Sequence, residues 1–158
     1  MGRLRLIDQY ASDEKVAVEF ENLLYSDSNR DTLRYLLCIL DYHFVSYHRG
    51  LRDANLIPNE NHNHLIDTLD IEHIYAQNHN YDPELNNDVN KIGNLTFWGD
   101  TDNRSSRDAL FDVKKDSYLD SSVRMTQSLG ELDEWTHIQF KERHDMILDM
   151  IKCIFYLY

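Results

Sequence analysis

The sequence predicts a mostly helical α+β domain in which helices flank a small strand–loop–strand–helix unit. Apolar residues recur at helical spacing near both ends of the chain, whereas the middle holds two short strand-like runs, TLDIEHIY and NLTFWG. A length of 158 residues fits one domain with a sizeable core. We therefore expect a single domain over 1–158.

The N-terminal helices are expected over 12–50, in two segments. Ser12 is a capping residue for the first segment and is followed by acidic residues and an apolar stripe. The second segment ends at Gly50. Its apolar stripe consists of Leu33, Leu36, Leu37, Leu40, Phe44 and Tyr47.

A C-terminal helix is expected over 134–157, after a weaker segment around SVRMTQSLGEL. Its apolar stripe consists of Trp135, Ile138, Met146, Ile147, Met150, Ile151 and Ile154. Trp98 and Trp135 are expected in the core.

The central unit is expected over 68–119. A polar, Asn-rich loop precedes it, and its two strands are separated by an irregular segment with Asp82-Pro83 as a turn signal. The second strand leads into a helix that begins with capping residues in NRSSRDALFDVKKDSYL.

The composition is typical of an ordinary soluble protein, with 42% apolar and 28% charged residues. The longest apolar runs, such as LLCIL, are too short to span a bilayer, and no leader for secretion opens the chain. We therefore expect a cytoplasmic protein without a membrane partner. Cys38 and Cys153 lie in apolar helical patterns, which indicates buried thiols rather than a zinc site.

The net charge of −12 is an objection to any role with nucleic acid. Proteins that bind nucleic acid usually carry a basic surface, because their affinity comes from neutralising phosphates. Sixteen Lys and Arg residues are too few to form a large basic surface here. Either the chain does not bind nucleic acid, or it has a small active site to which another domain or subunit delivers substrate.

Glu72 and His73 stand side by side where the first strand runs into loop, in the stretch DIEHIYAQN. For an arbitrary pair, the simplest interpretation is a solvent-facing glutamate beside a half-buried histidine. An alternating strand would also send the two side chains to opposite faces. The pair lies at the end of the strand, however, so a shared site is still compatible with the pattern.

The order of the following motifs resembles that of HNH, or His-Me finger, nucleases, which have a ββα-metal core. More narrowly, it resembles the C-terminal nuclease domain of GmrSD-type modification-dependent restriction enzymes. The matching stretches are IEHIYAQN, IGNLTFW, DNRSSRDALFDVKK and, distally, WTHIQFKER. The resemblance covers roughly 30–150 and is strongest over 69–115. The chain departs from the family at Ala76, where proline is usual, and at Asp108, where asparagine is frequent.

The resemblance implies roles for four residues. His73 is the expected general base, because an imidazole with an ordinary pKa near 6.5 can accept a proton from water at neutral pH. Glu72 and Asn103 offer oxygen ligands to one Mg²⁺ or Mn²⁺ ion. Asn94 is expected to hold the long loop and to orient the His73 ring.

Several of these residues have a second interpretation. Asn94 could be a turn or capping residue, and Asn103 could cap the helix that follows it. Lys114 and Lys115 could meet a neighbouring substrate phosphate, or could be solvated helix residues. His62 and His64, in an Asn-rich loop, are expected to be solvated rather than to form a metal site. His79 and Tyr81 lie in the loop over the site and could touch substrate. His137 and His144 are expected as surface or boundary residues of the last helix.

The sequence leaves three functions open. The first is a metal-dependent HNH endonuclease that nicks or cuts DNA in defence against phage or foreign DNA, with a separate recognition domain or subunit. The second is a non-catalytic helical interaction module with a decayed site, and the third is an RNase on the same core. The opening MGRLRLIDQYASDEK is compatible with an excised boundary, so the chain could be the C-terminal part of a longer protein.

Overall fold

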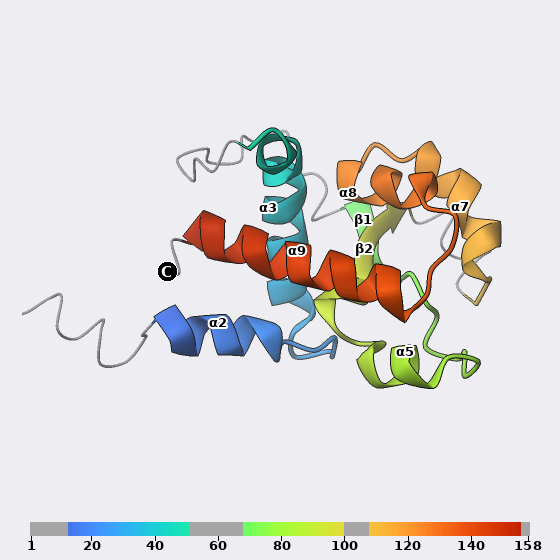
Figure 1. Ribbon diagram of the computed structural model, residues 1–158, viewed down its shortest axis with the longest axis horizontal. Helices are drawn as coiled ribbons and strands as arrows, with labels where there is room; N and C mark the ends of the chain where they lie inside the picture. Colours follow the sequence, from blue (N-terminus) through green and yellow to red (C-terminus); the bar gives the residue numbers. More distant parts are fainter. Residues whose placement is uncertain (1–12, 51–67, 100–107, 156–158) are drawn as a thin grey trace, which may run out of the picture.

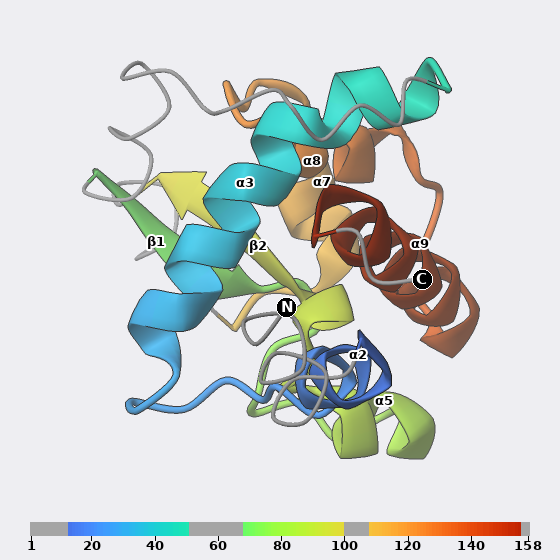
Figure 2. The ribbon, with the colours of Figure 1, turned by 90° about the vertical axis from the view of Figure 1, so that its left-hand side faces the viewer.

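A two-stranded antiparallel sheet lies at the centre of the fold, between helix α3 on one side and helix α7 on the other (Figures 1 and 2). The computed structural model describes residues 13–50, 68–99 and 108–155. In chain order, the elements are α2 (Asp13–Glu21), α3 (Arg30–His48), β1 (Leu69–His73), α5 (Pro83–Asp88), the 3₁₀ turn η1 (Ile92–Asn94), β2 (Leu95–Gly99), α7 (Phe111–Leu119), α8 (Arg124–Gln127), the 3₁₀ turn η2 (Ser128–Glu131) and α9 (His137–Phe155). The predicted fold class, a mostly helical α+β domain, is confirmed.

The register of the sheet assigns each strand residue to one of two cores. Ile71 pairs with Phe97, and Glu72 pairs with Thr96. Because side chains alternate along a strand, Ile71 and Phe97 share the face toward α3, and Glu72 and Thr96 share the face toward α7. The core on the α3 side includes Leu33, Leu36, Leu37, Leu40, Ile71, Phe97, Ile147 and Ile151. The core on the α7 side includes Ile74, Tyr75, Trp98, Phe111, Tyr118, Trp135 and Phe140.

Helix α9 packs against α2, α3, α5 and η1 and so joins the helical part of the molecule to the strands. Its approach to η1 is close at Gly93, where a Cβ atom would lie 2.6 Å from the Cβ of His144 and 2.9 Å from the Phe140 ring. A glycine is therefore required at this position. Arg143 on α9 is buried and donates hydrogen bonds to the carbonyl oxygens of Gly93 (2.7 Å) and Leu95 (3.0 Å).

The structure corrects two expectations about individual elements. The segment before Gly93 contains helix α5, capped by Asp82, whose carboxylate accepts hydrogen bonds from the backbone N–H groups of Glu84 and Leu85. Asp82-Pro83 thus starts a helix rather than a simple turn. Ile138, expected on the buried stripe of the last helix, is 65% exposed. No helix within the described ranges has the length and apolar character needed to cross a membrane.

Candidate active site

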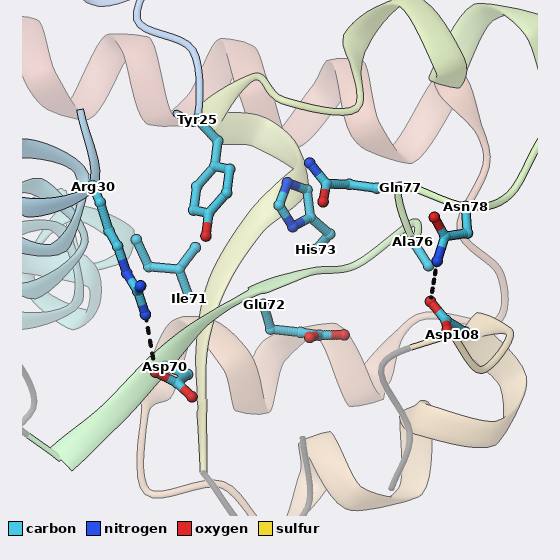
Figure 3. Close-up of a pocket in the computed structure, with 10 residues that line it drawn as sticks. All are labelled: Tyr25, Arg30, Asp70, Ile71, Glu72, His73, Ala76, Gln77, Asn78 and Asp108. Carbon is cyan, nitrogen blue, oxygen red and sulfur yellow. Dashed lines mark hydrogen bonds and ion pairs between the residues drawn. The ribbon is translucent and has the colours of Figure 1, made fainter. Parts of the chain in front are cut away.

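A pocket of about 340 Å³ lies along β1, beside the Glu72-His73 pair (Figure 3). Its walls come from the turn before α3, from β1 and the loop that follows it, and from the approach to α7. The lining residues are Tyr25, Arg30, Asp70, Ile71, Glu72, His73, Ala76, Gln77, Asn78 and Asp108. Hydrogen bonds between these loops help to close the pocket, because Asn78 donates to the Asp108 carboxylate (3.0 Å).

Glu72 and His73 leave β1 on opposite sides, as strand alternation requires. Figure 3 shows Ile71 and His73 on one side of the strand, and Asp70 and Glu72 on the other. Glu72 and His73 both line the pocket nonetheless. One site can therefore use the imidazole from one face and the carboxylate from the other.

The His73 ring is held by the amide of Asn90. The His73 Nε2 atom lies 3.2 Å from Asn90 Oδ1, and the Gln77 side-chain amide donates to the same oxygen at 2.8 Å. An amide oxygen can only accept, so Nε2 carries the hydrogen and Nδ1 is left as the proton acceptor. The Tyr25 ring meets the His73 ring edge-on, with 4.7 Å between the ring centres.

Burial lowers the pKa of His73 to about 4. Desolvation is the largest cause, the hydrogen bond with Asn90 acts in the opposite direction, and the nearby charge of Lys114 lowers the pKa further. The ring is therefore neutral at neutral pH, which is the form that accepts a proton.

Glu72 forms a buried ion pair with Lys114 of α7. The Lys114 Nζ atom lies 2.5 Å from Glu72 Oε1 and donates to the backbone oxygen of His73 at 3.0 Å. Lys114 is 0% exposed and Glu72 is 4% exposed. The ammonium group thus fixes the carboxylate and the end of β1 together.

Asn94 is fully buried and ties the long loop to the end of η1. Its side-chain oxygen accepts from the Tyr75 backbone N–H (2.8 Å) and from the Trp135 indole N–H (3.2 Å). Its nitrogen donates to the carbonyl oxygens of Tyr75 and Val89, both at 2.9 Å. These hydrogen bonds join Asn94 to the loop, whereas the residue that bonds the His73 ring is Asn90.

The structure also corrects the expectation for Lys114, which has no exposed surface and so cannot meet a substrate phosphate in this arrangement. Lys115 is 28% exposed, pairs with Asp133 at 3.7 Å and does not line the pocket. Asn103, His62 and His64 lie outside the described residues.

The sequence did not single out the residue that bonds the His73 ring, Asn90, or the pocket-lining residues Tyr25 and Arg30. Asn90 belongs to the polar stretch NNDVN, in which no position stands out. Tyr25 and Arg30 lie more than forty positions before His73 and reach the pocket only through the packing of α3 against the sheet. No short-range pattern could have indicated them.

The oxygen donors at the pocket suit a hard divalent cation. Asp70, Glu72 and Asp108 all contribute to its lining. No cluster of three or more His, Cys, Asp or Glu side chains with the spacing of a metal site occurs in the part of the chain that the structure describes. Mg²⁺ and Mn²⁺ keep several waters and need only one or two protein ligands, so Glu72 with one further oxygen donor is sufficient in chemical terms.

The chain matches a known protein family. Residues 10–150 match the family of the C-terminal domain of GmrSD restriction endonucleases. No curated protein sequence matches the chain significantly.

Proposed function

The chain belongs to the family of the C-terminal domain of GmrSD restriction endonucleases, and from this membership we propose that it is an HNH endonuclease domain that hydrolyses DNA phosphodiester bonds with a divalent metal. The observation that carries the proposal is the position and hydrogen bonding of the His73 ring. Its ring lines the pocket, and its Nε2–H is bonded to Asn90 Oδ1, so that Nδ1 is the atom that can accept a proton.

In the proposed reaction, His73 Nδ1 takes a proton from a water molecule, whose oxygen attacks the phosphorus of the scissile phosphodiester. The bond from phosphorus to the 3′ oxygen breaks as the new phosphorus–oxygen bond forms. Asn90 keeps the ring in the correct tautomer and aim, as hydrogen-bonded partners of a catalytic histidine commonly do. Asn94 keeps the loop that carries Asn90 and Gln77 in place.

The cation would be held by Glu72 and by Asn103, which lies outside the described residues. When bound, it supplies positive charge for the phosphate and the leaving oxygen. Lys114 holds the Glu72 carboxylate in a fixed position from the α7 side.

DNA is the proposed substrate because the family is one of restriction endonucleases. The net charge of −12 works against tight binding of DNA by this domain alone. We therefore propose that a recognition domain or subunit delivers the substrate. We also propose, from the family, that the activity serves defence against phage or foreign DNA in the cytoplasm.

A plasmid nicking assay tests the proposal. Supercoiled DNA is incubated with the wild type in Mg²⁺, Mn²⁺ or excess EDTA, and His73→Ala is compared with a matched control, His48→Ala, at the exposed end of α3. We expect cleavage that requires the metal, is lost in His73→Ala and is retained in His48→Ala. Cleavage in EDTA, or by His73→Ala, would contradict the mechanism. Cleavage of a matched RNA but not of DNA would assign the site to an RNase.

A further inference from the structure

The pocket has a charged end that the roles given above do not use. Arg30 is the first residue of α3, and its side chain is 47% exposed. Among the ten residues that line the pocket, Arg30 is the one with a cationic side chain. Figure 3 shows it on the same side of β1 as Tyr25 and His73.

Arg30 is held loosely by Asp70. One guanidinium nitrogen lies 3.4 Å from one carboxylate oxygen, which is longer than the roughly 2.7–2.9 Å of a good charged hydrogen bond. Asp70 also lies 3.9 Å from Arg34, one helical turn further along α3. The Arg34 side chain is only 13% exposed, and its guanidinium group lies over the Phe97 ring at 5.8 Å. Of the two arginines, Arg30 is therefore the one that solvent and substrate can reach.

Between Arg30 and His73 stands the Tyr25 ring, with its hydroxyl group directed toward β1 (Figure 3). A substrate phosphate that approaches His73 from this side meets a guanidinium group, a hydroxyl group and the neutral imidazole. On the other face of the strand Glu72 and its partner Lys114 are both buried, so this pair presents no exposed cation to a phosphate. The charge pattern therefore favours approach of the DNA backbone on the Arg30 side.

We propose that Arg30 binds a phosphate of the DNA strand next to the scissile one, and that Asp70 holds the guanidinium group in place until DNA displaces it. This inference rests on the proposed function and adds to it the residue that receives the backbone. Arginine suits the task, because its planar group can bond two phosphate oxygens at once.

The test is a titration of the full chain with a short DNA duplex in EDTA. Two-dimensional NMR monitors the titration, because it can measure affinities in the millimolar range. Arg30→Gln is compared with Arg49→Gln, which makes the same charge change in an exposed residue at the other end of α3, roughly 28 Å away along the helix. We expect Arg30→Gln to weaken binding roughly tenfold and Arg49→Gln to have little effect. The slope of log K against log salt should become shallower by about 0.7–0.9 in Arg30→Gln, which corresponds to one phosphate contact.

Asp70→Asn provides a readout that a purely structural role of the Arg30–Asp70 pair would not give. Removing the carboxylate frees Arg30, so binding should tighten, and the gain should be smaller in the Arg30→Gln background. Equal effects of Arg30→Gln and Arg49→Gln, or no shift near the start of α3 at the highest DNA concentration, would overturn the inference. An equal gain from Asp70→Asn in both backgrounds would do the same.

The same variants separate this inference from the proposed function. If the wild type binds DNA through Arg30 but does not cleave it with Mg²⁺ or Mn²⁺, the inference stands and the proposed activity fails. If the wild type cleaves DNA and Arg30→Gln cleaves it with unchanged kcat and KM, the activity stands and the inference fails.

Discussion

The ammonium group of Lys114 lies 2.5 Å from a carboxylate oxygen of Glu72, and both side chains are buried. A buried ion pair adds little net stability compared with an apolar pair, but removal of one partner leaves an uncompensated charge in the interior. The pair therefore constrains both residues. The carboxylate that is proposed to bind the metal cannot move without disturbing α7.

A double-mutant cycle on this pair gives the first prediction. Lys114→Met should lower the free energy of unfolding by about 3–5 kcal/mol, because it removes the ammonium group that offsets the buried negative charge of Glu72. Glu72→Gln should also destabilise the fold, because the buried charge of Lys114 loses its carboxylate counter-charge. The double variant should lose less than the sum of the two single losses. Urea unfolding of the four proteins measures this coupling. Additive losses would mean that the two groups do not depend on each other.

Metal binding should separate the roles of His73 and Glu72. His73→Ala should keep its affinity for Mn²⁺ while cleavage falls by about 10²–10⁴-fold, because a general base does not hold the metal. Glu72→Gln and Asn103→Ala should bind Mn²⁺ more weakly, and raised metal concentration should partly restore their cleavage. Calorimetric titration beside cleavage at several Mn²⁺ concentrations checks this. Equal loss of metal in all three variants would refute the assignment.

Substitution of Asn90 should lower the rate of cleavage and leave the affinity for the metal unchanged. Asn90→Ala removes the acceptor for His73 Nε2–H, so the ring can rotate and change tautomer, and kcat should fall by about 10–100-fold with Mn²⁺ affinity unchanged. Asn87→Ala, at an exposed position of the same segment, is the control. Asn90→Asp keeps an acceptor oxygen and should retain more activity than Asn90→Ala. If Asn90→Ala cleaves as fast as Asn87→Ala, the ring is oriented by other contacts.

Asn94→Ala should loosen the loop between the strands. The substitution removes an acceptor for two buried N–H groups and donors to two carbonyl oxygens. Each unsatisfied buried group costs about 1–3 kcal/mol, so the total loss should be on the order of 3 kcal/mol or more. Thermal unfolding measures the loss, and hydrogen exchange should show faster exchange of the Tyr75 amide. Unchanged protection of that amide would contradict the loop-holding role.

His144 should make stability fall as the solution becomes more acidic. Burial lowers its pKa, with a smaller contribution from Lys91, while Asp145, Asp88 and Glu21 act in the opposite direction. The unfolded chain therefore takes up a proton near pH 6.5 that the folded protein does not. The loss of folding stability that results from this difference is absent above pH 6.5 and grows as the pH falls below 6.5. Urea unfolding at pH 7.5 and 5.5 should show a smaller pH dependence in His144→Gln than in the wild type.

The sequence predicted the parts of the fold that depend on local periodicity. The stripe that includes Leu33, Leu36 and Leu40 placed α3 correctly, and alternation in LDIEH placed β1. Helix α5 was missed because its six residues are too few to show a period, although Asp82 and Pro83 were visible as its cap and first residue. Ile138 was assigned to the buried stripe, but it lies on the outward face of α9, which also exposes Glu142 and Asp145.

The candidate site was less predictable, because its supporting contacts join distant parts of the chain. Lys114 was expected either to meet a substrate phosphate or to be a solvated helix residue, and only the packing of α7 against the sheet places its ammonium group beside Glu72. Asn90 and Asn94 lie four positions apart and have the same side chain, so the residue that bonds the His73 ring could not be chosen without coordinates.

The pairing of Glu72 with Thr96 has a consequence for how the site can change. A slip of β1 by one residue against β2 would turn every side chain of the strand to the other face. Glu72 would then point toward Tyr25, and His73 would face the ammonium group of Lys114. The site thus depends on which face of β1 each residue occupies as well as on residue identity. An insertion of an odd number of residues in β1 would exchange the faces of the base and the carboxylate while leaving both residues in the sequence.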